Sequence, residues 1–449
     1  MNGQILKFPG WLLALMTIML LLFSAAAHAA IDGISGTTFN LTAGTTHINT
    51  ADGNSIFIWG FADGAKRTQY PGPTLIVNQG DTITVNLTNT LDEPVSIVFP
   101  GQTVTATGGI PGLITREADK KAGNVSGTVS YTFIASQPGT YLYHSGTHQD
   151  LQVEMGLFGA LIVRPTGFNP MAPTAYGHPG SAYEREFLFL LSEMDPAIHA
   201  KVELGRKAQV DTSATHLVSW FINGRGGPDT MAPAGAAAPH LPSQPYNCMP
   251  VTTPGDRVLL RLIGANRDLH PFHTHGNNFQ LIAKDGKMLS SDPLLGPDLA
   301  ISNFTQRVVP GETYDALFTW TGQGLNWDVY GPPAGDPVKG IAPHTCNGLA
   351  VASAGFDPVT MEYCPDHGKA FPVALPSPLE LTNGPQFSGS PFLGVLGALP
   401  PGQGTGNLEG GYFYMWHSHN ERELTNNDIF PGGLFTMLMV VPRAAMMAP

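Results

Sequence analysis

The chain carries a strand–turn–strand pattern at Thr74-Leu75-Ile76-Val77-Asn78-Gln79-Gly80-Asp81-Thr82-Ile83-Thr84-Val85-Asn86-Leu87. An apolar stretch leads to a Gly-Asp turn, after which apolar and polar residues alternate one by one. Such alternation is typical of a β-strand that buries one face, and the preceding Tyr70-Pro71-Gly72-Pro73 is typical of a turn. The pattern therefore predicts short strands joined by tight turns.

The same layout recurs at Val251-Thr252-Thr253-Pro254-Gly255-Asp256-Arg257-Val258-Leu259-Leu260-Arg261-Leu262. Each copy continues to a histidine at the end of an apolar strand, His144 in the first and His417 in the second, and then to a glycine-led apolar strand. Two copies of one β-unit predict an all-β chain with two similar sandwich domains. The second copy is longer because it contains a Pro- and Gly-rich stretch, about 331–404, which we interpret as a long loop insertion.

These features set the expected domain limits. We expect a first domain over residues 30–165, a linker over 166–181 and a second domain over 182–442. Residues 1–29 have a basic Lys7, an apolar run from Trp11 and the ending Ala27-His28-Ala29, which predict a cleaved signal peptide. The alternative is a single membrane anchor. Because no later stretch is long and apolar enough to span a bilayer, we expect a periplasmic or secreted product without a membrane span after processing.

The composition fits this fold class. Apolar residues make up 42% of the chain and charged residues 12%, while 53 glycines and 39 prolines favour many turns over long surface helices. The formal net charge is −12. Phosphate contacts require Lys and Arg, so we expect no nucleic-acid partner. An acidic chain is compatible with cationic or metal partners.

The chain has three cysteines, Cys248, Cys346 and Cys364. In an oxidising compartment two of them can pair. Cys346 and Cys364 lie in one Pro/Gly-rich region, so the favoured pairing joins them and leaves Cys248 free. The alternative is a Cys/His metal site that also uses His344 and His367, although the spacing is irregular for zinc.

The histidines carry the strongest chemical signal. Side chains two apart on a strand point to one face, so His273 and His275 should project together, as should His417 and His419. His270 lies on the opposite phase and can serve a different site. Imidazole is a good ligand for copper, zinc, iron and nickel, and two His-x-His pairs at strand ends favour a metal site over solvated or core histidines. His148, four residues after His144, is a further candidate ligand.

Several segments together resemble multicopper oxidases of the laccase type. They are Tyr70-Pro71-Gly72-Pro73-Thr74, Tyr143-His144-Ser145 with Gly156-Leu157-Phe158-Gly159, Phe221-Ile222-Asn223-Gly224, His270-Pro271-Phe272-His273-Thr274-His275-Gly276 and Trp416-His417-Ser418-His419. The resemblance implies two cupredoxin-like Greek-key β-sandwich domains. It also implies a blue copper that accepts electrons, and a trinuclear copper cluster that reduces dioxygen to water.

The resemblance also assigns the histidines. His273 matches a ligand of the lone copper in the cluster, and His270 matches the blue-copper histidine. The ligands of the paired coppers are matched by four residues, His144, His275, His417 and His419.

The chain departs from this family at several ligand positions. Ser418 replaces the cysteine of the blue centre, and Glu423 stands where its other histidine belongs. A blue centre needs a thiolate with two imidazoles, so we expect none here; His270 and Glu423 would form an apolar-lined remnant or a different, weak metal site. In the first domain, residues 93–102 contain no histidine, and Gly146 stands where another ligand belongs. Two interpretations remain for the polar segment 420–433. Its side chains either orient the imidazoles, or they form hydrogen bonds within a capped loop of their own.

The residues and the resemblance together predict a copper-binding protein. We expect one or two copper ions, held by His144, His273, His275, His417 and His419, with His148 as a further candidate. The favoured function is an oxidoreductase that takes electrons from a small-molecule or metal-ion reductant and passes them to dioxygen. The alternative is a non-catalytic protein for copper storage, delivery or tolerance. In two-domain relatives such sites lie between subunits, which implies a homotrimer.

Overall fold

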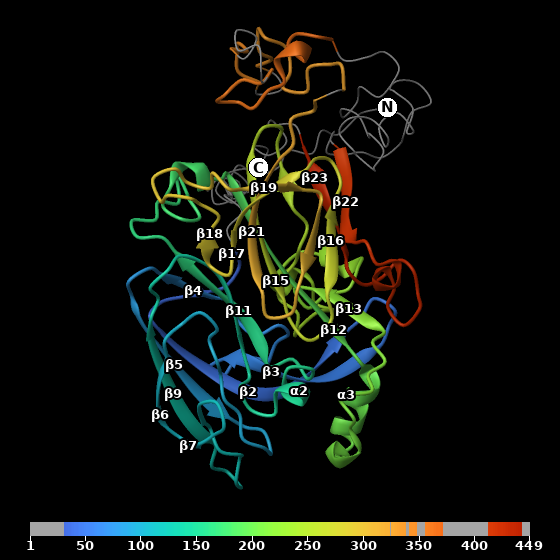
Figure 1. Cartoon of the computed structure of the whole chain (residues 1–449). Helices are drawn as coiled ribbons and strands as arrows, with labels where there is room; N and C mark the ends of the chain where they lie inside the picture. Colours follow the sequence, from blue (N-terminus) through green and yellow to red (C-terminus); the bar gives the residue numbers. More distant parts are fainter. Residues whose placement is uncertain (1–30, 324, 338–340, 348–354, 371–411, 442–449) are drawn as a thin grey trace, which may run out of the picture.

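The computed structural model describes residues 31–323, 325–337, 341–347, 355–370 and 412–441 (Figure 1). The predicted signal peptide, residues 1–29, lies outside this part of the chain, and so does much of the predicted insertion. Within the described ranges, no helix is long and apolar enough to cross a bilayer.

The first sandwich consists of two facing sheets, at the bottom of Figure 1. One sheet has the order β3-β2-β5-β9-β6, with β2 (Thr38–Asn49), β3 (Ser55–Asp63), β5 (Thr82–Asn89), β6 (Thr105–Gly108) and β9 (Gly127–Ile134). The other has the order β1-β4-β11-β10, with β1 (Ile34–Ser35), β4 (Leu75–Asn78), β10 (Gly139–His144) and β11 (Phe158–Arg164). A small ribbon pairs β7 (Ile110–Pro111) with β8 (Arg116–Glu117). Along β5 the apolar residues Ile83, Val85 and Leu87 are buried, as their alternation predicted.

The second sandwich repeats this plan. One sheet has the order β13-β12-β15-β21-β17-β18, with β12 (Arg185–Met194), β13 (Ser219–Ile222), β15 (Arg257–Gly264), β17 (Phe279–Lys284), β18 (Lys287–Met288), β21 (Thr313–Thr319) and, off this path, β19 (Ile301–Asn303). The facing sheet has the order β14-β23-β22-β16-β20, with β14 (Val251–Thr252), β16 (His270–Thr274), β20 (Thr305–Val308), β22 (Tyr412–Ser418) and β23 (Phe435–Val440).

The pairing pattern confirms the repeat seen in the sequence. β5 lies parallel to β2 and antiparallel to β9, just as β15 lies parallel to β12 and antiparallel to β21. β11 lies parallel to β4 and antiparallel to β10, just as β23 lies parallel to β14 and antiparallel to β22. Each sandwich encloses its own apolar core. The all-β fold predicted from the sequence is therefore confirmed.

Helices are short and lie outside the sheets. They are α2 (Gln149–Gln152), α3 (Pro196–Glu203), η1 (Pro179–Ser181), η2 (Lys207–Gln209), η3 (Asp229–Met231), η4 (Gly235–Ala237), η6 (Cys364–Asp366) and η7 (Glu421–Leu424). α3 begins after Asp195, whose carboxylate accepts from the Ala197 amide at 2.9 Å, with Pro196 in the first turn. These short helices lie at the edges of the sandwiches, and the candidate metal ligands lie at the ends of strands.

A buried ionic network ties the two sandwiches together. Arg164 of β11 donates to Glu186 of β12 at 2.7 Å, and Arg261 of β15 donates to the same carboxylate at 3.0 Å. Arg261 also donates at 2.9 Å to the hydroxyl of Thr140 on β10, which in turn donates to Asp315 at 2.6 Å. Buried charges need such partners because losing water is costly. The network therefore fixes how the sandwiches pack.

The cysteines pair as favoured from the sequence. Cys346 and Cys364 form a disulfide, and Cys248 is a buried thiol. The alternative in which these cysteines bind a metal is wrong, because the disulfide uses both sulfur atoms. Residues 355–370, in orange at the top of Figure 1, lie at the end of the second sandwich far from the first.

Candidate metal centre

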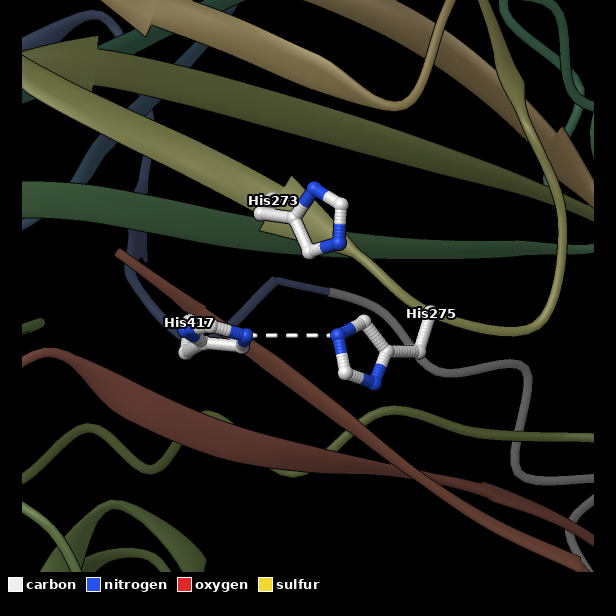
Figure 2. A group of neighbouring side chains, drawn as sticks. All are labelled: His273, His275 and His417. Carbon is white, nitrogen blue, oxygen red and sulfur yellow. Dashed lines mark hydrogen bonds between the residues drawn. The ribbon is translucent and has the colours of Figure 1, made fainter. Parts of the chain in front are cut away.

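Three histidines meet where β16 and β22 pair. The antiparallel register sets His273 directly opposite His417, and His275 follows one residue beyond the end of β16. The indole of Trp416 donates to the His275 carbonyl at 2.9 Å and fixes that strand end. One ligand atom from each histidine lies within 4.8 Å of the other two, and Figure 2 shows the three rings around a common space. The sequence predicted that His273 and His275 project together, and both contribute a ring to this cluster.

The spacing of the rings fits one shared ion. Nε2 of His417 lies 3.3 Å from Nε2 of His275, along the dashed line in Figure 2. Two nitrogens that each bind an ion at about 2.0–2.1 Å lie about 3.3 Å apart when the angle is near tetrahedral. The residues present therefore suit a metal with imidazole ligands.

The surroundings keep the rings of His273 and His417 neutral and oriented. Burial, together with the neighbouring His275, His417 and His419, lowers the pKa of His273 to about 3, and burial also lowers the pKa of His417. The Nδ1–H of His417 donates to the Ser418 carbonyl at 2.6 Å, which leaves Nε2 with its lone pair. A neutral imidazole whose other nitrogen is hydrogen-bonded is the form in which histidine binds metals.

His419 lies beside this cluster. Its ring centroid is 4.9 Å from that of His273 and 5.6 Å from that of His417. Its amide donates to the Pro271 carbonyl at 2.8 Å, and its side chain is exposed. His419 therefore stands at the open rim of the cluster, next to the three buried or half-buried rings.

His144 and His148 do not join this cluster. Among the residues that the structure describes, His144 belongs to no group of metal-compatible side chains. It ends β10, and its Nδ1–H donates to the Ser145 carbonyl at 2.9 Å, in the same way as His417. His148 is half exposed and faces the carboxylates of Glu93 and Asp150 at 3.5 and 3.9 Å. The predicted ligands therefore lie in two separate places, one beside the cluster in the second domain and one in the first domain.

The strand register explains why the first domain offers few ligands. Val98 pairs with His144 as His273 pairs with His417, so an apolar side chain occupies the corresponding ligand position. Gly146 corresponds to His419, and a Cβ atom there would lie 2.7 Å from Val98 and 2.9 Å from the Ser96 hydroxyl. This edge of the first domain therefore has no room for a side chain at residue 146.

The residues that match the blue-copper position form a charged triad. His270 is fully buried; its Nδ1 lies 2.9 Å from Glu423 Oε2 and its Nε2 lies 3.0 Å from Glu193 Oε2. Burial alone would lower the pKa of His270, but the hydrogen bonds and charges of the two glutamates raise it to about 9. The ring is thus an imidazolium between two carboxylates. This corrects the expected apolar lining around His270 and Glu423, because a second carboxylate fills the space and both ring nitrogens are occupied.

Sequence reasoning missed Glu193. It lies on β12, fully buried, and accepts from the backbone amides of Arg267 and Asp268 at 2.8 and 3.0 Å as well as from His270. A glutamate inside the apolar strand Phe187–Met194 was the available signal, since a buried carboxylate needs a charged or hydrogen-bonding partner.

Comparisons with known proteins agree with the fold. Copper resistance protein A homolog of Pseudomonas syringae pv. tomato is 29% identical over 313 residues, covering 64% of this chain and 48% of that protein. Copper resistance protein A of Escherichia coli is 27% identical over 362 residues, covering 73% and 54%. The chain thus spans about half the length of these relatives. A blue copper oxidase structure from Nitrosomonas europaea aligns with TM-score 0.52 at 20% identity, covering 89% of this chain and 85% of that one.

Two family models, both described as multicopper oxidase, match residues 58–167 and 216–318. One match lies in each sandwich, and the second includes His270, His273 and His275. The multicopper oxidase family implies copper as the cofactor. With this repeated fold and the histidines at its strand ends, the matches identify multicopper oxidase domains in both sandwiches.

Proposed function

We propose that this protein is an exported copper-dependent oxidoreductase that lacks a blue copper centre. One or two coppers would be held by His273, His275 and His417, with His419 beside them, and dioxygen would be the electron acceptor. Residues 1–29 would direct export to the periplasm or the exterior. Electrons from a small-molecule or metal-ion reductant would enter at the histidine site itself.

The observation that carries this proposal is the cluster of three histidines. His273, His275 and His417 present ligand atoms within 4.8 Å of one another, and burial lowers the pKa of His273 and His417. Copper bound there would supply one-electron chemistry toward dioxygen. The chain's own contribution is to hold the rings of His273 and His417 deprotonated and to orient them, His417 through the Ser418 carbonyl and His273 through the Thr305 hydroxyl, 2.7 Å from its Nδ1.

The triad at the blue-copper position supports direct entry of electrons. His270 has both nitrogens engaged by Glu193 and Glu423, and Ser418 offers a hydroxyl where the family has a thiolate. A serine hydroxyl is not an anion at physiological pH, so a thiolate-bound relay has no ligand here.

The test is metal analysis with EPR and visible spectroscopy on the protein as isolated. We expect bound copper without an intense blue band. His275→Gln with His417→Gln should lower the copper content, whereas His47→Gln, on an exposed histidine, should not. Unchanged copper content in the double variant would rule out this site.

The position of His144 suggests how a second subunit would complete the copper site. It carries the same Nδ1 hydrogen bond as His417 yet lies outside the cluster of its own chain. We propose that His144 of one subunit, with His148 near it, faces the cluster of another subunit in a homo-oligomer, for which a trimer is the family's precedent. Mixing His144→Gln protein with the His275/His417 variant should then restore copper binding in part. No restoration, with a monomeric mass in solution, would exclude the shared site.

The alternative function is copper binding without turnover. The names of two relatives, copper resistance proteins, favour it. Oxygen uptake with phenols, Mn(II), Fe(II) or Cu(I) decides between the two functions. Uptake that disappears in the His275/His417 variant supports the oxidoreductase, and copper-loaded protein without uptake supports storage, delivery or tolerance.

A further inference from the structure

Four side chains converge beside the Cys346–Cys364 disulfide, on loops that take no part in the copper cluster. They are Asp328, His344, Glu362 and His367, each offering one ligand atom within 4.8 Å of the others. We propose that they form a second metal site, which binds a divalent first-row transition-metal ion such as Zn²⁺ or Cu²⁺. This site shares no residue with the histidine cluster and does not depend on the function proposed above.

The contacts among the four side chains are close. His367 Nδ1 lies 2.6 Å from Glu362 Oε1 and 3.8 Å from Asp328 Oδ2. His344 Nε2 lies 3.6 Å from the other oxygen of Glu362, and the two imidazole centroids are 5.2 Å apart. One carboxylate therefore stands between two imidazoles, with a second carboxylate at its side.

Burial makes this arrangement costly without a cation. Glu362 is 1% exposed, and its Oε2 has no hydrogen-bond partner among the described residues. His344 Nε2 is likewise buried without a hydrogen bond in the part of the chain that the structure describes. A buried polar atom without a hydrogen bond costs about 1–3 kcal/mol. An ion between these two atoms would satisfy both, and a divalent charge would balance the two carboxylates.

The surrounding hydrogen bonds aim the ligands inward. The Nδ1–H of His344 donates to the Ala342 carbonyl at 3.3 Å, so Nε2 keeps its lone pair. The Asp328 carboxylate accepts from the Gly368 amide at 2.8 Å and from the Tyr330 amide at 2.9 Å. Such contacts fix ring tautomers and carboxylate orientation in metal sites.

The disulfide holds the two ligand-bearing loops together. Cys346 follows His344 by two residues, and Cys364 lies between Glu362 and His367. A crosslink at this place removes much of the freedom of both loops before any ion binds. The ligands are thus positioned in advance, which favours tight binding.

The ligand types select the class of ion. Two imidazoles with two carboxylates suit Zn²⁺, Cu²⁺ and neighbouring first-row ions, since zinc sites use nitrogen and oxygen donors and Cu²⁺ ranks highest in affinity for such sets. Ca²⁺ and Mg²⁺ prefer all-oxygen sites, and Cu⁺ prefers sulfur.

The experiment titrates metal-stripped, full-length protein with Zn²⁺ and, separately, Cu²⁺. The His275→Gln/His417→Gln variant serves as background so that the histidine cluster does not contribute. We expect one ion per chain in this background by calorimetry and by elemental analysis after desalting. Adding Glu362→Gln or His344→Gln should weaken binding at least about 10-fold, since losing even an outer contact costs that much. The matched control, His47→Gln with Glu203→Gln, removes an exposed His–Glu pair and should change nothing.

Folding is checked independently by the thiol count, which should be one per denatured chain because only Cys248 is free. If Glu362→Gln fails this check, His344→Gln carries the test, since its ring is at the edge of the site and 17% exposed. A background chain that binds neither ion would overturn the proposal. So would affinity that is unchanged in the His344 variant, because the four side chains would then be an ion-pair network alone.

Discussion

Replacing Glu423 with glutamine is expected to reduce the pH dependence of stability that the Glu193–His270–Glu423 triad creates. The two carboxylates raise the pKa of His270 from an ordinary 6.5 to about 9. A folded-state pKa above the unfolded value stabilises the fold fully below about pH 6.5, and the contribution is lost as pH rises to about 9. At about 1.36 kcal/mol per pH unit, the loss over this window is about 3 kcal/mol. Removing one of the two carboxylates should roughly halve this loss of stability between pH 6.5 and pH 9.

The assay is chemical denaturation at intervals from pH 6 to pH 9.5, followed by tryptophan fluorescence. Trp220, Trp320, Trp327 and Trp416 belong to the core of the second sandwich, so the signal reports mainly on the domain that contains His270. The matched control is Glu184→Gln, which breaks an exposed pair with Arg257 and should cost no more than about 1 kcal/mol at any pH. Parallel pH profiles for the wild type and Glu423→Gln would refute the ion-paired triad.

Three further variants test the rest of the structure. Glu186→Gln should lower the free energy of unfolding by about 3–5 kcal/mol, because two buried arginines lose a shared carboxylate; an unchanged denaturation midpoint would contradict this. Replacing both Cys346 and Cys364 with serine should cost about 3 kcal/mol for a separation of 18 residues, and reducing the wild type should have the same effect on thermal unfolding. Ser418→Cys with Glu423→His should produce an intense visible band on copper addition, which neither single substitution gives; a copper-loaded but colourless double variant would refute the assignment of these positions.

The sequence predicted the parts of the molecule that depend on local periodicity. Ile83, Val85 and Leu87 alternate and are buried. His273 and His275 were predicted to project together, and both contribute a ring to the histidine cluster. The repeated Gly-Asp unit likewise predicted two sandwiches, since each copy contains the same turn and strand order.

The contacts that the sequence did not predict join residues far apart along the chain. Glu193 meets His270 because β12 and β16 lie in facing sheets of one sandwich, and nothing near Glu193 in the sequence indicates that packing. In the insertion, His344 and His367 were noticed because cysteines lie beside them. The carboxylates of Asp328 and Glu362 were missed because loop spacing follows no period that a sequence pattern can show.

The two sandwiches share one backbone plan but offer very different numbers of ligands at equivalent strand ends. His144 and His417 are equivalent in register and in their Nδ1 hydrogen bond, yet only the second has imidazoles at its neighbouring positions. Val98 fills one of these positions in the first domain, and the close packing around Gly146 closes another. A single chain therefore gathers at most four rings at one edge and one at the other. A copper site with only imidazole donors needs about three or four of them. The unequal number of histidines at the two edges therefore supports one copper held by the second domain alone. A second copper would bind only where the edge of a first domain supplies His144.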